Sequence, residues 1–190
     1  MANISIIYHS GYGHTAKQAE AVLAGLRAVP DVKARLITAE EATKDLSQFA
    51  SDDCLIFGCP TYMGGPSAQF KTFIDATSKV WFKQGWKDKL AAGFTNSGSP
   101  SGDKLSTLSS LVVMAMQHSM IWVGTGLLPA NSKASTRNDI NYLGGSGGAL
   151  AQSPSDSSPD EGPLSGDLET AKIFGARIVE VSQQFNKGRS

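Results

Sequence analysis

Three short segments of this chain have the residue types that bind phosphates and flat rings. Each is rich in glycine and hydroxyl side chains and directly follows a short apolar run; the segments span residues 10–15, 60–65 and 95–102. The apolar runs have the length and composition of β-strands. If those strands are parallel, all three segments leave one edge of one sheet, where open α/β folds bind nucleotides. We therefore expect the segments to form one site.

The first segment has the composition of a phosphate cradle. Its residues are Ser10, Gly11, Tyr12, Gly13, His14 and Thr15. The hydroxyls, the close approach that glycine permits and the free amides of a helix start all suit a terminal phosphate. No Lys-Ser or Lys-Thr pair follows the last glycine, which argues against a nucleoside triphosphate, and the match to the dinucleotide fingerprint is weak. A tight turn that only needs small residues is the alternative interpretation.

The second and third segments suit a planar ring. The second contains Pro60, Thr61, Tyr62, Met63 and Gly64, and the third contains Asn96, Ser97, Gly98, Ser99 and Gly102. An aromatic ring and a thioether beside small residues favour stacking, although a glycine turn in which Tyr62 only covers the core is the alternative. Uncharged donors suit the edge of a heterocycle. Together the segments predict a mononucleotide with a planar head, and FMN fits better than ATP.

Strands and helices must alternate to position these segments. Helical periodicity is found after the first segment, over residues 68–78 and 103–118, and from near Asp167 onward. This alternation predicts an α/β fold, a three-layer α/β/α sandwich with a five-stranded parallel sheet. A half-exposed second strand at residues 32–36 beside buried first and third strands favours the order 2-1-3-4-5, with residues 120–124 as the fifth strand.

The overall composition indicates a single domain over residues 1–190. The charges balance at 17 cations and 17 anions, so nucleic acid is not an expected partner. The chain start lacks a signal-peptide pattern and the longest apolar stretch, residues 111–116, is too short to span a membrane, which predicts a cytoplasmic protein. Cys54 and Cys59 should lie on opposite faces of one strand as reduced thiols. No metal site is expected.

Residues 124–166 have almost no periodicity and are crowded with glycine, serine and proline. Their composition alone favours disorder as much as an ordered loop. Loops of this length within a domain are otherwise lids or contact surfaces.

The chain resembles the WrbA-type NAD(P)H:quinone oxidoreductases of the flavodoxin superfamily. The likeness rests on residues 12–14, 60–64, 69–75, 95–102, Trp81, and His118 followed by Met120. It implies FMN with its phosphate on residues 10–15, its ring against Thr61, Tyr62 and Met63, and its pyrimidine edge near residues 96–102. It also implies that residues 124–166 form a lid or a subunit contact near the flavin.

The resemblance implies roles for further residues. Tyr12 would flank the nicotinamide of NAD(P)H, Trp81 would flank the quinone, and His118 would approach the flavin and could assist it. Otherwise the flavin carries the chemistry and no catalytic side chain is needed. Tyr62 and Met63 stand where the family often has Arg-Phe, which changes the surroundings of the flavin ring.

We therefore expect an FMN-dependent NAD(P)H:quinone oxidoreductase that works by two-electron, ping-pong transfer as a homo-oligomer, a dimer or a tetramer. One alternative is a flavodoxin-type FMN electron carrier, although such carriers tend to be strongly acidic and this chain is neutral. The other is an FMN-binding interaction or sensor module, which the long segment at residues 124–166 suggests.

Overall fold

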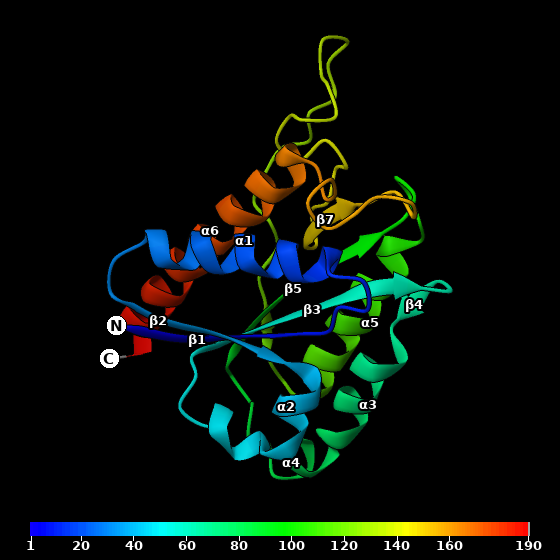
Figure 1. Ribbon diagram of the computed structural model, residues 1–190. Coiled ribbons are helices and arrows are strands. Elements are labelled where there is room, and N and C mark those ends of the chain that lie inside the picture. Colours follow the sequence, from blue (N-terminus) through cyan, green and yellow to red (C-terminus); the bar gives the residue numbers. More distant parts are fainter. Residues whose placement is uncertain (190) are drawn as a thin grey trace.

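A parallel sheet runs through the centre of the computed structural model, which describes residues 1–189 (Figure 1). Its strands lie in the order β2-β1-β3-β5-β6. Their bounds are β1 (Ala2–Tyr8), β2 (Val32–Thr38), β3 (Cys54–Tyr62), β5 (Leu90–Ser97) and β6 (Ile121–Trp122). The predicted α/β class and the strand order 2-1-3-4-5 are confirmed. The residues of β3 are buried almost without interruption and this strand lies inside the sheet, whereas β2, in which exposed and partly buried residues alternate, lies at its edge.

The fifth strand differs from its prediction. The short β6 pairs only with Leu90 and Ala91 at the start of β5, and β7 (Ala149–Gln152) pairs with residues 94–97 at its end. Two pieces separated by a long excursion of the chain therefore share one position in the sheet. A small β4 (Gly65–Pro66) adds an antiparallel pair to β3.

Helices cover both faces of the sheet (Figure 1). One face packs against α1 (His14–Ala28) and α6 (Ser165–Arg189). The other packs against α2 (Ala39–Lys44), the 3-10 helix η1 (Leu46–Phe49), α3 (Ala68–Ala76) and α5 (Lys104–Gln117), with α4 (Ser78–Phe82) following α3. No helix within residues 1–189 is long and apolar enough to cross a membrane.

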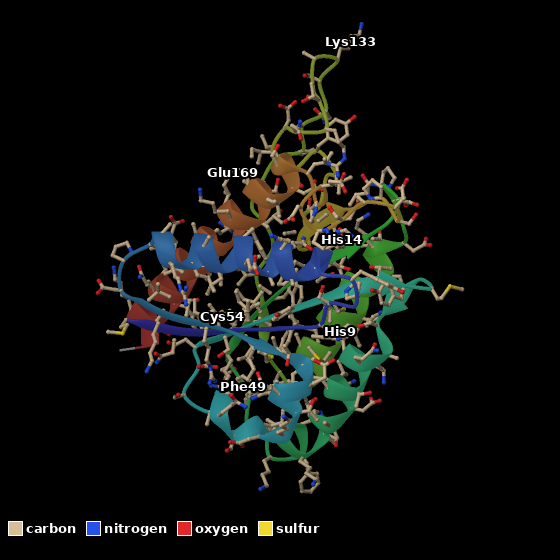
Figure 2. All side chains as sticks on the ribbon, in the orientation of Figure 1. His9, His14, Phe49, Cys54, Lys133 and Glu169 are labelled. Carbon is tan, nitrogen blue, oxygen red and sulfur yellow. The ribbon has the colours of Figure 1, made fainter. Side chains whose placement is uncertain are left out.

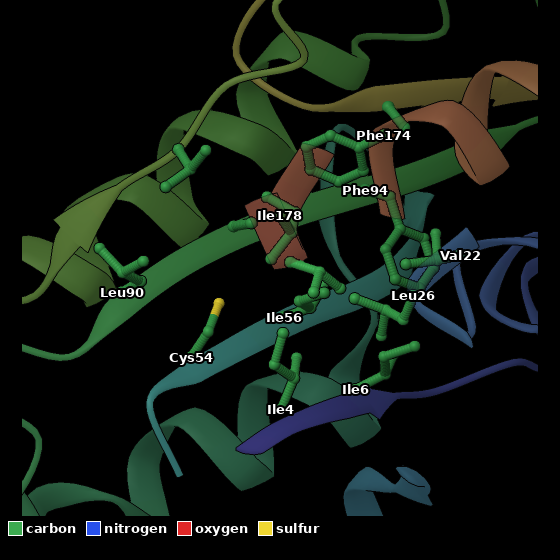
Figure 3. Packing of buried hydrophobic residues seen from close by; sticks show 14 of the residues in the cluster. Ile4, Ile6, Val22, Leu26, Cys54, Ile56, Leu90, Phe94, Phe174 and Ile178 are labelled. Carbon is green, nitrogen blue, oxygen red and sulfur yellow. The ribbon is translucent and has the colours of Figure 1, made fainter. Parts of the chain in front are cut away.

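Two apolar cores result, one on each face. Figure 3 shows the first, in which Ile4, Ile56 and Phe174 pack together. Cys54 belongs to this core and Cys59 to the other, and both are free thiols, as predicted. Burial raises the pKa of both thiols, that of Cys59 to about 12, so both are protonated at neutral pH.

The hydrophobic periodicity of residues 103–118 predicts a buried stripe on α5, and this prediction is partly wrong; the stripe would contain Leu105, Leu108, Leu111, Val112 and Met116. Leu105 is 77% exposed and Met116 is 49% exposed, whereas Lys104 and Thr107 are buried with Leu108 and other residues. The buried face of α5 is rotated away from Leu105 because Lys104 and Thr107, which the hydrophobic pattern leaves outside, are held inside by hydrogen bonds to the third segment and to Thr61.

Residues 124–166 contain more regular structure than their composition predicts. After β6 the chain makes an excursion whose tip, marked by Lys133, projects from the body (Figure 2). It returns as β7, and residues 153–163 then form a loop that leads into α6. The excursion is tied down at its base, where Asn141 donates its backbone N–H to the hydroxyl of Thr170 in α6 at 2.8 Å.

Candidate functional site

The three predicted segments meet at one cavity of about 520 Å³ at the carboxyl edge of the sheet. Its volume lies in the range of small-molecule sites. The predicted residues that line it are Ser10, Tyr12, His14, Thr15, Pro60, Thr61, Tyr62, Asn96, Ser97 and Gly98. Four predicted residues of the same segments shape the loops without lining the cavity: Gly11, Gly13, Gly64 and Gly102. Met63 and Ser99 do not line it either.

The first segment forms a cradle at the start of α1. The hydroxyl oxygen of Ser10 accepts hydrogen bonds from the amides of Gly13 and Ala16, both at 3.1 Å, and Gly13 has a left-handed backbone with φ of 90°. Within residues 1–189, the amides of His14 and Thr15 and the nearly buried hydroxyl of Thr15 have no hydrogen-bond partner. A helix start with unpaired donors is a ready binding site for a phosphate.

Two tyrosines form an aromatic rim. Tyr12 is 77% exposed, and its ring centroid lies 6.3 Å from that of Tyr62 in an edge-on arrangement. Burial, and secondarily the neighbouring Tyr12, raises the pKa of Tyr62. A side chain at Gly11 would come within 2.5 Å of the Tyr62 hydroxyl, so only glycine permits this packing. Met63 points away, fully exposed, so the aromatic wall consists of the two tyrosines and not of Tyr62 with Met63.

A buried network of hydroxyls supports the cavity from below. Thr61 lies 2.8 Å from the hydroxyls of both Thr95 and Thr107, and Thr95 donates to the carbonyl of Cys59 at 2.7 Å. These bonds fix the end of β3 against β5 and α5. Thr107 was not predicted, because its place in a helix gives no sign that it faces the sheet edge.

The loop of residues 153–163 supplies a wall that sequence reasoning did not place residue by residue. Ser153, Pro154, Ser155 and Ser157 line the cavity. Two contacts connect this loop to the cradle. Nδ1 of His14, at the start of α1 (Figure 2), lies 2.8 Å from the carbonyl oxygen of Gly162, and Lys17 forms an ion pair with Asp160 at 3.1 Å. The high serine content of this loop, which resembles that of the third segment, is the sequence feature that could have indicated a place at the cavity.

Trp81 and His118 do not lie at this cavity. Both line a separate groove of about 680 Å³ between α3, α4 and α5. His118 is 4% exposed, its Nε2 bonds the hydroxyl of Thr77 at 2.9 Å, and its ring lies 4.6 Å from that of Trp86. Burial lowers the pKa of His118 to about 4, so it is neutral at pH 7.

Comparison with known proteins gives related sequences over the whole chain. The model of the family described as NADPH-dependent FMN reductase matches residues 9–134. A protein named Flavodoxin FldP from Pseudomonas aeruginosa is 46% identical and covers 98% of this chain and 100% of its own length. An NAD(P)H dehydrogenase (quinone) from Archaeoglobus fulgidus is 32% identical over 97% of this chain and 99% of its own length.

A solved structure extends this likeness to three dimensions. The flavodoxin, WrbA-like protein from Agrobacterium tumefaciens has a TM-score of 0.75 and 40% identity, and covers 97% of this chain and 99% of its own.

Proposed function

Because the chain belongs to the NADPH-dependent FMN reductase family, we propose that it binds FMN in the cavity lined by the three segments and the loop of residues 153–163, and acts as a flavodoxin-type electron carrier. It is flavodoxin-like, as its motifs predict. A flavin brings its own redox chemistry, so the chain needs only to bind and orient it and to leave it open to a partner.

The residues present fit FMN. The unpaired amides of His14 and Thr15 and the hydroxyl of Thr15 suit the terminal phosphate, with the start of α1 favouring negative charge. Tyr12 and Tyr62 would flank the ring, and the uncharged donors of residues 96–98 would face its polar edge.

Carboxylates in the loops beside the cavity support the carrier function. Asp156 lies between the cavity-lining residues Ser155 and Ser157, and the exposed Asp160 belongs to the same loop; Asp103 directly follows the third segment. Lys17 pairs with Asp160. The opposite edge, where the strands begin, has charges of both signs, with Asp31 and Asp88 shortly before β2 and β5 in sequence and Lys33 and Lys87 close by. A neutral net charge is therefore compatible with a local group of carboxylates in the loops around the cavity.

Reduction of a basic protein acceptor tests the carrier function. FMN-loaded protein, reduced anaerobically, is mixed with cytochrome c, and we expect a rate that falls steeply as salt rises. The double variant Asp103→Asn, Asp156→Asn should slow this transfer by about tenfold at low salt. The matched control, Asp31→Asn with Glu180→Gln, removes two exposed acids near the opposite edge and should leave the rate unchanged. Equal rates in all three proteins at every salt concentration would contradict a docking role.

NAD(P)H:quinone oxidoreductase activity is the second candidate. It is supported by the exposed rings of Tyr12 and Tyr62, on which a second planar molecule could stack, and by the relatives named NAD(P)H dehydrogenase (quinone). Steady oxidation of NADH or NADPH with benzoquinone by catalytic amounts of protein would favour it over the carrier. In this alternative Trp81 and His118 would have to come from a second copy, because their own chain holds them in another groove. A dimer or tetramer in solution is then required.

A further inference from the structure

A buried lysine lies directly behind the third loop. Lys104, the first residue of α5, is 1% exposed, and its Nζ donates to the carbonyl oxygens of Ser99, Pro100 and Ser101 at 2.6, 2.9 and 3.3 Å. Within residues 1–189, no carboxylate lies within 4.0 Å of this ammonium group. Burial lowers the pKa of Lys104 to about 8, so the group is still mostly protonated at pH 7.

The other acceptors of this loop are occupied as well. The carbonyl oxygen of Gly98 accepts from Nε2 of Gln152 at 2.9 Å, and that of Ser99 accepts additionally from the hydroxyl of Ser97 at 3.1 Å. Every carbonyl from residue 98 to residue 101 is therefore bonded inside the protein. By contrast, the amides of Gly98, Ser99, Ser101 and Gly102 have no acceptor within the described part of the chain.

An ion pair holds this arrangement from the other side. Asp167, in the first turn of α6, is 2% exposed and accepts two bonds from the guanidinium of Arg137 at 2.8 and 2.6 Å. The same carboxylate accepts the amide of Gln152 at 2.9 Å and so fixes the end of β7 beside the third loop. The charge of Asp167 raises the pKa of Lys104, and that of the paired Arg137 lowers it.

We propose that Lys104 is a positioning residue that, together with Gln152, holds the carbonyls of residues 98–101 inside the protein and so keeps the free amide of Gly98 at the cavity as a donor for the polar edge of the flavin ring. The inference rests on the proposed binding of FMN. Donors backed by a buried cation favour negative charge at the ring edge. Reduction increases that charge, so the loop should bind reduced flavin more tightly than oxidised flavin.

The test combines a loop measurement with a flavin measurement. Lys104→Met removes the charge and keeps the length of the side chain; Lys79→Met, at an exposed position on α4, is the matched control. In the flavin-free proteins, the backbone amides of residues 104 and 106, which bond to the carbonyls of Ser101 and Asp103, should exchange at least tenfold faster in Lys104→Met and stay unchanged in the control. In the loaded proteins, the ratio of reduced to oxidised FMN affinity should fall about tenfold, a potential shift of about 30 mV for two electrons.

Two further variants keep the test decisive if Lys104→Met does not fold. Lys104→Arg keeps the charge and should retain most of the ratio of reduced to oxidised FMN affinity. Gln152→Ala loses the side-chain bond to the carbonyl of Gly98. It should change the exchange rate and the affinity ratio in the same direction as Lys104→Met, by a smaller amount. Unchanged loop exchange and an unchanged affinity ratio in the folded variants would overturn the proposal. Failure of the unmodified protein to bind FMN would instead reject the proposed function, and the exchange measurement would still decide the role of Lys104 in the loop.

Discussion

The loop cavity and the groove between α3, α4 and α5 differ in how the chain builds them. The cavity collects loops from distant parts of the chain, each at the end of a parallel strand, and is lined by hydroxyls, amides and two tyrosines. The groove lies between neighbouring helices and is lined by Trp81, Ile74, Val113 and Met114 with a row of serines on α5. The topology of the sheet determines where the cavity lies, but it does not determine where the groove lies.

This difference explains which predicted residues come together. The rule that parallel strands end at one edge predicts that residues 10–15, 60–65 and 95–102 form one site, and all three segments contribute lining residues to one cavity. Trp81 and His118 were assigned only from a family resemblance, and they lie in the groove. The comparison predicts that substitutions at the cavity change flavin affinity and that substitutions at the groove do not.

The largest effect is expected for Gly13→Ala. A methyl group at this left-handed residue would approach Pro159 to 2.6 Å and push the loop of residues 153–163 away from the cradle. FMN affinity, measured by quenching of flavin fluorescence, should fall at least about 100-fold. Gly144→Ala is the matched control, since it has a similar positive φ of 69° but its nearest neighbour would be 3.7 Å away. Comparable affinity losses in both variants would show that backbone strain, and not the cradle, is responsible.

His118 should affect acid stability and leave flavin affinity unchanged. Its pKa is about 4 in the folded protein and near 6.5 when unfolded, so the unfolded state binds the extra proton first and stability falls as pH drops from 6.5 toward 4. Urea unfolding should show about 2 kcal/mol lost between pH 7 and pH 4.5 through this residue. His118→Gln should lack that part of the loss. An FMN affinity reduced tenfold by His118→Gln would break the distinction between the two regions.

Thr15→Val should weaken FMN binding by about tenfold, because it removes a hydroxyl that has no protein partner and keeps the shape of the side chain. Thr72→Val, on the exposed side of α3, is the control and should leave binding as it is. Isothermal titration with FMN measures both. The phosphate interpretation is sharpened if riboflavin, which lacks the phosphate, binds both variants equally well.

The smallest effect is expected for Trp81→Ala. This side chain is 47% exposed in the groove, so FMN affinity should change less than about twofold. Tyr62→Ala, at the rim of the cavity, is the comparison and should lower FMN affinity about tenfold. Equal losses in these two variants at protein concentrations where only single chains are present would place Trp81 at the flavin.

Local patterns predicted the strands, their order and the three loops, because strand burial and glycine-rich strand ends are visible in the sequence. They did not predict that β6 and β7 share one position, since four residues of β7 lie in a stretch whose composition resembles a flexible linker. Lys104 was missed because a lysine in an amphipathic helix is ordinarily solvated. Its burial follows from the carbonyls of a loop that only the folded chain brings over it.

Hydrogen exchange of the flavin-free protein with and without FMN tests the central claim most directly. We predict that FMN slows exchange at residues 10–16, 61–62, 96–99 and 153–158 together, and leaves residues 77–82 and 106–118 as they were. Slower exchange confined to the helices of the groove, or to only one of the loops, would contradict the account.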